Sequence, residues 1–151
     1  MRTVKDIIHS KPPATNVIEP DALVIDALAM LEKVNLSYLI VLSDDEFKGI
    51  FSERDYSRNV ILKGRSSKKT KVEQVMTVNL PVVSLTDTVE QCMKSMNDNK
   101  ARYLLAYDRR NFRGVVTIHD LLRQVLANRE EVFDNNVAQN LIDQEESGFI
   151  Y

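Results

Sequence analysis

The chain has little of the material that disulfides, metal centres and catalytic triads require. It contains one cysteine, two histidines and no tryptophan among 151 residues. A single cysteine, Cys92, excludes an intramolecular disulfide and a zinc site built from cysteines, and two histidines leave little for a catalytic triad or a histidine-rich metal centre. No set of residues supplies a nucleophile, a base and an orienting group. The sequence therefore predicts a protein that is not an enzyme and needs no metal.

Long apolar runs and an excess of one charge are also missing. No unbroken apolar run exceeds five residues, the length reached at 38–42 and 103–107, whereas a membrane-spanning helix needs roughly 20. Residues 1–11 lack the apolar stretch of a secretory signal. The formal net charge of −2 gives no general positive field for nucleic acid or an anionic membrane. These features favour a cytoplasmic protein whose partners include neither nucleic acid nor a membrane.

An internal repeat is the most informative feature that the sequence does contain. Residues 18–56 align with residues 83–121 at an offset of 65 without a gap. The identical pairs are Val24/Val89, Tyr38/Tyr103, Leu39/Leu104, Phe47/Phe112, Gly49/Gly114 and Asp55/Asp120. A gap-free match of glycines, turns and helix starts is hard to obtain by chance. The chain is therefore predicted to contain two copies of one structural unit.

Both copies predict the same succession of elements: strand, helix, strand, strand, helix. In the first copy we expect a strand near 17–18, a helix that begins after Asp21, strands at 38–42 and roughly 47–51, and a helix from Ser52 to about Lys63 with Gly64 as C-cap. In the second copy we expect a strand near 82–83, a helix that begins after Thr86, strands at 103–107 and roughly 112–116, and a helix from Thr117 to about Asn128. The first helix of each copy carries apolar residues at i, i+3, i+4 and i+7, which is typical of a helix laid on a core. These residues are Val24, Ala27, Leu28 and Leu31, and then Val89, Cys92, Met93 and Met96.

This succession defines a mixed α+β fold of two β-α-β-β-α repeats with a C-terminal helical extension. A unit of about 60 residues is only marginally stable by itself, so the two repeats are expected to pack sheet to sheet as one module. The expected boundaries are residues 4–64 for the first repeat, 65–71 for a basic linker, 72–129 for the second repeat and 130–151 for a polar C-terminal helix or tail. In that tail, apolar residues that include Leu141 could line one side of a helix and dock on a partner subunit.

The region around the linker, residues 63–71, holds five cationic side chains. One interpretation is a solvated crossover between the repeats. The other is a strap whose cationic side chains bind a phosphate, although the GxxxxGK[ST] spacing of a P-loop is absent. Under the second interpretation Arg65 and Lys68 are the candidate phosphate-binding residues.

Each repeat carries the motif G-h-x-[ST]-x-x-D, in which h is apolar, at 49–55 and at 114–120. The strand ends at the hydroxyl residue and a helix begins there, so unpaired N–H groups and the helix dipole attract phosphate. The aspartate lies one helical turn on, where its carboxylate can accept hydrogen bonds from both hydroxyls of a ribose. The same spacing is also that of a capping box, in which the aspartate bonds back to the N-cap amide. The motif therefore predicts nucleotide binding, with a purely structural cap as the alternative.

The paired units and this motif resemble a tandem cystathionine-β-synthase (CBS) domain pair, also called a Bateman module. The resemblance covers residues 4–128, including the openings at 4–8 and 72–76. The stretch 51–56 followed by 64–68 is similar to small stand-alone CBS-pair proteins of bacteria and plant organelles. The resemblance implies a non-enzymatic regulatory module that binds an adenosyl ligand (AMP, ADP, ATP, NAD(H) or S-adenosylmethionine) in clefts between the two sheets. It also implies a homodimer and a separate regulated protein target.

The resemblance implies a role for each matched position. The ribose is expected at Asp55 and Asp120. The phosphate is expected to face Ser52, Arg54, Thr117 and His119. The adenine is expected to contact Thr15, Asn16, Val17 and Tyr38 in the first repeat, and Leu80, Pro81, Val82 and Tyr103 in the second. Ile118 stands where the family usually has a polar residue, which predicts unequal affinity of the two sites.

Other functions remain open at this point. A ligand-free interaction scaffold would use the hydroxyl–aspartate pairs only as helix caps, and a sensor of S-adenosylmethionine would use the same site for a different ligand. A small nucleotide hydrolase is least favoured, because the sequence sets no general base beside a metal cluster.

Overall fold

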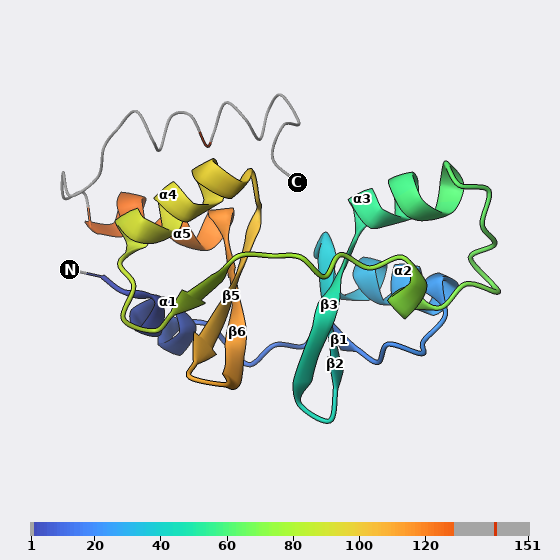
Figure 1. Cartoon of the computed structure of the whole chain (residues 1–151), viewed down its shortest axis with the longest axis horizontal. Coiled ribbons are helices and arrows are strands. Elements are labelled where there is room, and N and C mark those ends of the chain that lie inside the picture. The colour runs from blue at the N-terminus through green and yellow to red at the C-terminus, as the bar shows by residue number, and fades with distance from the viewer. Residues whose placement is uncertain (1, 129–140, 142–151) are drawn as a thin grey trace. The chain divides into compact units, whose positions relative to one another are not determined.

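The computed structural model describes residues 2–128 and Leu141, and it divides the chain into two compact units (Figure 1). Unit 2 consists of residues 13–79, whereas unit 1 combines residues up to Pro12 with those from Leu80 onward. Each unit holds one three-stranded sheet with helices packed on it. The mixed helix-and-sheet class predicted from the sequence is confirmed.

Unit 2 contains the elements of the first repeat in the expected order. They are β1 (Val17–Ile18), α2 (Val24–Val34), β2 (Tyr38–Ser43), β3 (Glu46–Ser52), α3 (Glu53–Asp55), the π-helical turn η1 (Tyr56–Ile61) and the 3₁₀ turn η2 (Val72–Gln74). The sheet order is β1-β2-β3, with β1 parallel and β3 antiparallel to β2. The helix predicted from Ser52 to about Lys63 is thus a short α-helix that continues as a π-helix, in which Leu62 N–H donates to Ser57 O.

Unit 1 repeats this topology with one helix added before it. Its elements are α1 (Val4–Ser10), β4 (Val82–Ser84), α4 (Val89–Asn99), β5 (Tyr103–Asp108), β6 (Asn111–Thr117) and α5 (Ile118–Asn128). The sheet order is β4-β5-β6, again with one parallel and one antiparallel pairing. The two ladders shift register at matching places, next to Gly49 and next to Gly114.

The predicted starts of the first helix in each copy are two residues too early. The N-caps are Leu23 and Thr88 in place of Asp21 and Thr86. Thr88 forms a capping box with Gln91, the arrangement that satisfies free amides with side chains. A leucine cannot do this. The first amides of α2 instead donate to backbone carbonyls of the linker, which therefore caps the helix.

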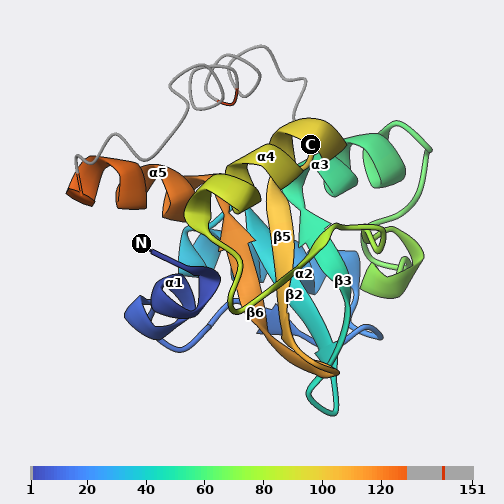
Figure 2. The same cartoon turned by 60° about the vertical axis from the view of Figure 1, so that its left-hand side comes forward.

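The segment that precedes the first strand of each repeat packs on the sheet of the other repeat. Helix α1 precedes β1 but lies against β6, as Figure 2 shows, and Val4 N–H donates to Asp87 O over 2.9 Å. In unit 2 Thr77, which precedes β4, pairs with Ile50 of β3 through two backbone hydrogen bonds. The compact units are consequently not the same sets of residues as the sequence repeats.

This exchange of segments between the repeats explains why both repeats have a glycine at the same aligned position. A Cβ on Gly114 would lie 3.0 Å from Ile8 Cδ1 of α1, and a Cβ on Gly49 would lie 2.7 Å from Met76 Sδ and 2.9 Å from Thr77 O. The absence of a side chain at each position lets the preceding segment approach the strand closely.

Replacing Gly49 with alanine is therefore expected to lower the free energy of unfolding by about 1–3 kcal/mol, as overpacking does. The backbone oxygen of Thr77 cannot move aside without disturbing its pairing with Ile50. Gly64 provides the contrast, because it has φ of +68° and nothing within 4 Å of an added Cβ, so Gly64→Ala meets only backbone strain, about 1–2 kcal/mol. Urea unfolding followed by circular dichroism measures both. A loss below 0.5 kcal/mol for Gly49→Ala contradicts the steric argument.

The buried residues form one apolar core in each unit. The predicted helix stripes are confirmed, since Val24, Ala27 and Leu31 lie in the core of unit 2 and the matching side chains of α4 lie in that of unit 1. Burial, assisted by the charge of Asp87, raises the pKa of the Cys92 thiol to about 12, which makes it an unreactive core side chain. None of the helices described is both long and apolar enough to cross a membrane.

Most of the predicted C-terminal helix or tail lies outside the described residues. Leu141 is described, and it is fully buried in the core of unit 1 together with residues of α1, α4 and α5. The expectation that Leu141 faces a partner subunit is therefore wrong, because its side chain packs on its own chain.

Candidate functional site

The sheet topology gathers the predicted nucleotide-binding residues at one end of each sheet. Because β1 runs parallel to β2 and β3 runs antiparallel to it, the start of β1, the start of β2 and the end of β3 share an edge. In unit 2 this edge holds Asn16, Tyr38 and Ser52. Tyr38 stands opposite Ser52 in the ladder, and Asn16 Nδ2 donates to Tyr38 O over 3.1 Å.

Unit 1 forms the same arrangement from the second repeat. Tyr103 stands opposite Thr117, and Pro81 O accepts a hydrogen bond of 2.9 Å from Leu105 N–H. Val82 is 61% exposed at this edge, whereas Tyr103 and Thr117 are buried. Each unit thus contains a complete set of the predicted adenine, phosphate and ribose residues of one repeat.

In unit 2 the aspartate of the motif closes a capping box. Ser52 N–H donates to Asp55 Oδ2 over 2.8 Å, Ser52 Oγ donates to the same oxygen over 3.0 Å, and Asp55 N–H donates to Ser52 Oγ over 3.2 Å. The other carboxylate oxygen, Asp55 Oδ1, accepts a hydrogen bond of 2.7 Å from the hydroxyl of Thr77. The capping box that the motif allows is therefore formed in unit 2, and Asp55 is only 1% exposed.

In unit 1 the matching aspartate is held by cations as well. Thr117 N–H donates to Asp120 Oδ2 over 2.9 Å, and Lys11 Nζ lies 2.8 Å from the same oxygen. Arg123 Nη2 lies 2.8 Å from Asp120 Oδ1. Burial alone would raise the pKa of Asp120, but Lys11 above all, then Thr117 N–H and Arg123, outweigh it and hold this pKa below its usual value.

A capping carboxylate can still serve a sugar. Ribose hydroxyls donate hydrogen bonds of the same kind as those that Asp55 already accepts from Ser52 and Thr77, so a ribose could exchange with them without leaving a buried charge unpaired. The two interpretations of the motif can therefore hold in turn, one without ligand and one with it.

The other predicted phosphate contacts differ in how they are placed. Arg54 is half-buried and His119 exposed, each in the first helical turn after the hydroxyl residue. Arg65 Nη1 lies 3.2 Å from Asn59 O and 3.5 Å from Gln74 O, so its guanidinium is directed at backbone carbonyls. Lys68 is exposed. The linker is thus more than a solvated crossover, because it is tied to unit 2 by these contacts and by its capping of α2.

Sequence reasoning missed two residues of these sites, Lys11 and Thr77. Both lie outside the aligned repeat and reach an aspartate only because the preceding segments are exchanged between the repeats. The similarity of residues 4–8 to 72–76 was the signal available, since it marks both segments as counterparts.

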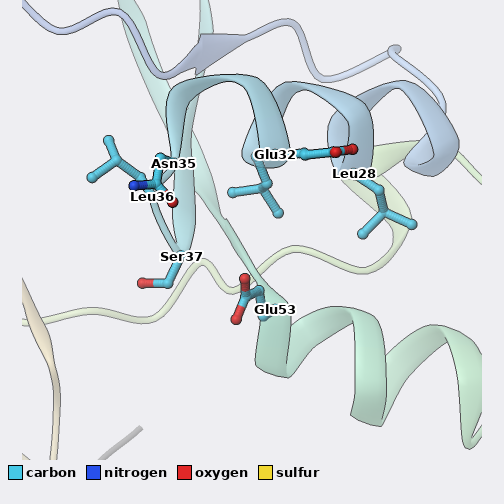
Figure 3. Close-up of a pocket in the computed structure, with 7 residues that line it drawn as sticks. Leu28, Glu32, Asn35, Leu36, Ser37 and Glu53 are labelled. Carbon is cyan, nitrogen blue, oxygen red and sulfur yellow. The ribbon is translucent and has the colours of Figure 1, made fainter.

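A pocket of about 530 Å³ opens in unit 2 beside the motif, where α2 ends and α3 begins (Figure 3). It is lined by Leu28, Leu31, Glu32, Asn35, Leu36, Ser37 and Glu53. Two carboxylates and no cation line it, which does not suit a phosphate. The pocket is therefore not the place predicted for the nucleotide. No group of three or more metal-ligating side chains occurs in the part of the chain that the structure describes.

Comparison with known families identifies the class of protein. The CBS domain model matches the chain twice, at residues 4–61 and 72–127. The chain therefore belongs to the CBS domain family, and its two matched segments make it a CBS-domain pair.

Relatives with solved structures or curated descriptions agree with this class. CBS domain-containing protein CBSX3, mitochondrial, of Arabidopsis thaliana is 32% identical over 140 residues, which are 86% of this chain and 68% of that protein. A protein with CBS domains from Burkholderia ambifaria MC40-6 has a structure that superposes with a TM-score of 0.77 at 31% identity, covering 88% of this chain and all of that one. A crystal structure of CBSX2 in complex with AMP has a TM-score of 0.68 at 26% identity, covering 85% of this chain and 98% of that one.

Proposed function

We propose that the chain is a regulatory protein that binds an adenine nucleotide, with AMP as the first candidate. The observation that carries this proposal is the position of Asp55, a buried carboxylate at a helix start that accepts hydrogen bonds from exchangeable hydroxyl donors. The AMP complex of the similar protein CBSX2 supports the choice of ligand. ADP, ATP, NAD(H) and S-adenosylmethionine share the ribose and are the alternatives.

Each part of the ligand has a counterpart at the edge of the sheet. The aspartate accepts the ribose hydroxyls, and the positive end of the helical segment 53–61 attracts the phosphate. Arg54 and Ser52 add donors there, while the backbone around Asn16 and the ring of Tyr38 border the adenine. Regulation follows if the nucleotide prefers one conformation of the chain, because a ligand shifts an equilibrium only by its difference in affinity for the two states. A homodimer, a separate regulated protein target and a cytoplasmic location belong to the same proposal.

Asp55→Asn is expected to weaken AMP binding in unit 2 at least tenfold, because a charge-assisted hydrogen bond contributes about 1.5–3 kcal/mol. AMP at 100 times its Kd should add about 2.7 kcal/mol of apparent stability to the wild-type chain, and the variant should lose most of this gain. Thermal melting with and without AMP, together with isothermal titration calorimetry, measures both quantities.

Asp44→Asn is the matched control, since it removes one carboxylate charge from an exposed turn. It should leave the AMP effect unchanged. If neither AMP nor the alternative nucleotides raise the melting temperature of the wild-type chain, the protein is a ligand-free scaffold and the proposal is wrong.

A further inference from the structure

The loop that follows η1 concentrates positive charge. The chain has 20 basic and 22 acidic residues, and six of the basic residues, with none of the acidic ones, lie in residues 56–72. These six are Arg58, Lys63, Arg65, Lys68, Lys69 and Lys71. The net charge of −2 therefore combines a strongly positive segment with a negative remainder.

Four of these cations, all of them lysines, have no acidic partner in the part of the chain that the structure describes. They are exposed, and no described carboxylate lies within ion-pair distance of them. The four are Lys63, Lys68, Lys69 and Lys71. Their ammonium groups are therefore available to an anionic partner.

The basic loop, residues 61–71, is attached to unit 2 at the start of α2 and can be followed in green in Figure 1. The first two amides of α2 donate to Thr70 O and Ser67 O over 2.9 Å each. The motif lies at the other end of α2, where Glu53 N–H donates to Ser37 O. Helix α2 has 11 residues, so about 15 Å of helix separates the two places. The basic loop is therefore a different surface from the predicted nucleotide site.

Two large apolar side chains are exposed on the same loop. Ile61 is 54% exposed and Leu62 is 76% exposed. Backbone hydrogen bonds from Gly64 N–H to Ile61 O and from Arg65 N–H to Val60 O hold the turn that carries them. The loop therefore presents apolar side chains next to lysines on a hydrogen-bonded backbone.

The composition of the basic loop favours a lipid surface over a protein or a nucleic acid. Lysine is depleted and arginine enriched in protein–protein interfaces, and here the four available cations are all lysines. Proteins that bind single-stranded nucleic acids stack the bases on aromatic side chains, whereas the one aromatic residue of 56–72, Tyr56, packs against the core of unit 2. Lysines beside exposed aliphatic side chains are typical of proteins that bind the surface of an anionic membrane.

We propose that residues 61–71 form a membrane-binding loop, in which the four lysines contact anionic lipid headgroups and Leu62 enters the boundary between headgroups and acyl chains. This binding is peripheral and separate from the proposed nucleotide site. The expectation of no membrane partner rested on the net charge of the whole chain. Charges in solution act over a Debye length of about 8 Å at physiological ionic strength, so the charge of the loop itself decides whether an anionic surface attracts it.

Co-sedimentation with phospholipid vesicles, without nucleotide, tests the inference. The wild-type chain should bind vesicles of equal parts phosphatidylserine and phosphatidylcholine, and it should not bind vesicles of phosphatidylcholine alone. Salt at about 1 M, where the Debye length is about 3 Å, should weaken the binding at least tenfold. The triple variant Lys68→Gln, Lys69→Gln, Lys71→Gln should also bind at least tenfold more weakly, because each lysine near the lipid surface contributes a factor of about five.

The matched control is a triple variant of the same net charge, Lys5→Gln, Lys33→Gln, Lys94→Gln, which removes exposed lysines from α1, α2 and α4. It should change vesicle binding by less than twofold. Leu62→Ser should weaken the binding at least threefold, whereas Leu126→Ser, which alters a 73% exposed leucine of α5, should leave it unchanged. Circular dichroism checks that every variant is folded.

Failure of the wild-type chain to bind the mixed vesicles, or equal weakening by the two triple variants, overturns the inference. An equal effect of the two serine variants overturns the insertion of Leu62. A wild-type chain that ignores the vesicles but binds polyglutamate or polyuridylic acid through the same lysines also overturns it, since the loop would then recognise an acidic protein or RNA. None of these outcomes affects the proposed function, because AMP binding is measured separately.

Discussion

Replacing Asp120 with alanine is expected to lower the free energy of unfolding of unit 1 by about 2–3 kcal/mol at pH 7. The carboxylate is 4% exposed and accepts hydrogen bonds from Thr117 N–H, Lys11 and Arg123. Its loss removes one half of a capping box and leaves the partly buried Lys11 ammonium without a counter-ion. Removing one partner of such an ion pair destabilises the fold because the remaining charge is no longer compensated. Arg123 can turn to water and contributes little.

The loss of stability caused by Asp120→Ala should be larger at neutral pH than at acidic pH. Burial raises the pKa of Asp120, but the interactions with Lys11, Thr117 N–H and Arg123 outweigh it and hold the pKa below its usual value. A carboxyl group with a depressed pKa in the folded state stabilises that state above its unfolded pKa, about 3.9, and loses this effect as the pH falls through the folded pKa. The difference between wild type and Asp120→Ala should therefore be complete at pH 7 and shrink below about pH 4.

Urea unfolding at pH 7 and pH 3, without nucleotide, measures this prediction. Asp108→Ala is the control in the same unit, because Asp108 forms an exposed pair with Arg113 at 3.6 Å, and such pairs contribute about 0–1 kcal/mol. Equal losses for the two variants at pH 7 would show that the Asp120 ion pair does not stabilise the fold.

The second large effect is expected from Leu141→Ala, which should lower the free energy of unfolding by about 2–5 kcal/mol. The Leu141 side chain is fully buried among apolar residues of α1, α4 and α5. Its truncation removes apolar burial and leaves a cavity, and the sum of these two effects lies in this range for buried leucines.

Leu126→Ala serves as the matched control, since Leu126 belongs to α5 of the same unit and is 73% exposed. It should change the stability by less than about 0.5 kcal/mol. Urea denaturation monitored by circular dichroism separates the two variants. A change of similar size in both would mean that Leu141 is not part of the core in solution.

Much of the fold could be predicted from the sequence because local patterns determine it. The helix stripes of α2 and α4 follow from apolar spacing, and the strands from short apolar runs between turn residues. The N-cap of α2 could not be found in this way, since carbonyls of Ser67 and Thr70, more than 40 positions along the chain, accept its first amides. The π-helical turn after Asp55 also leaves no mark in the apolar spacing.

The motif of each candidate site could be predicted from the sequence, whereas the residues that contact the motif from elsewhere in the chain could not. The hydroxyl and aspartate of each copy stand within one short segment, so spacing alone places them at a helix start. Lys11 and Thr77 reach those aspartates from across the chain, 109 and 22 positions away. No periodic pattern in the sequence predicts such contacts. They form only because the segments before the first strands are exchanged between the two repeats.

Unit 1 is built from two separate stretches of the chain, and this determines the order in which the two units can fold during synthesis. Unit 2 is an uninterrupted segment, residues 13–79, so all its strands leave the ribosome together and it can fold while the rest of the chain is still being made. Residues 2–12 must wait until β6 and α5 have been translated, because these elements complete the surface on which α1 packs. Residues 2–12 are thus made before the rest of unit 1 and are among the last to reach their native contacts, a long-range closure that slows folding.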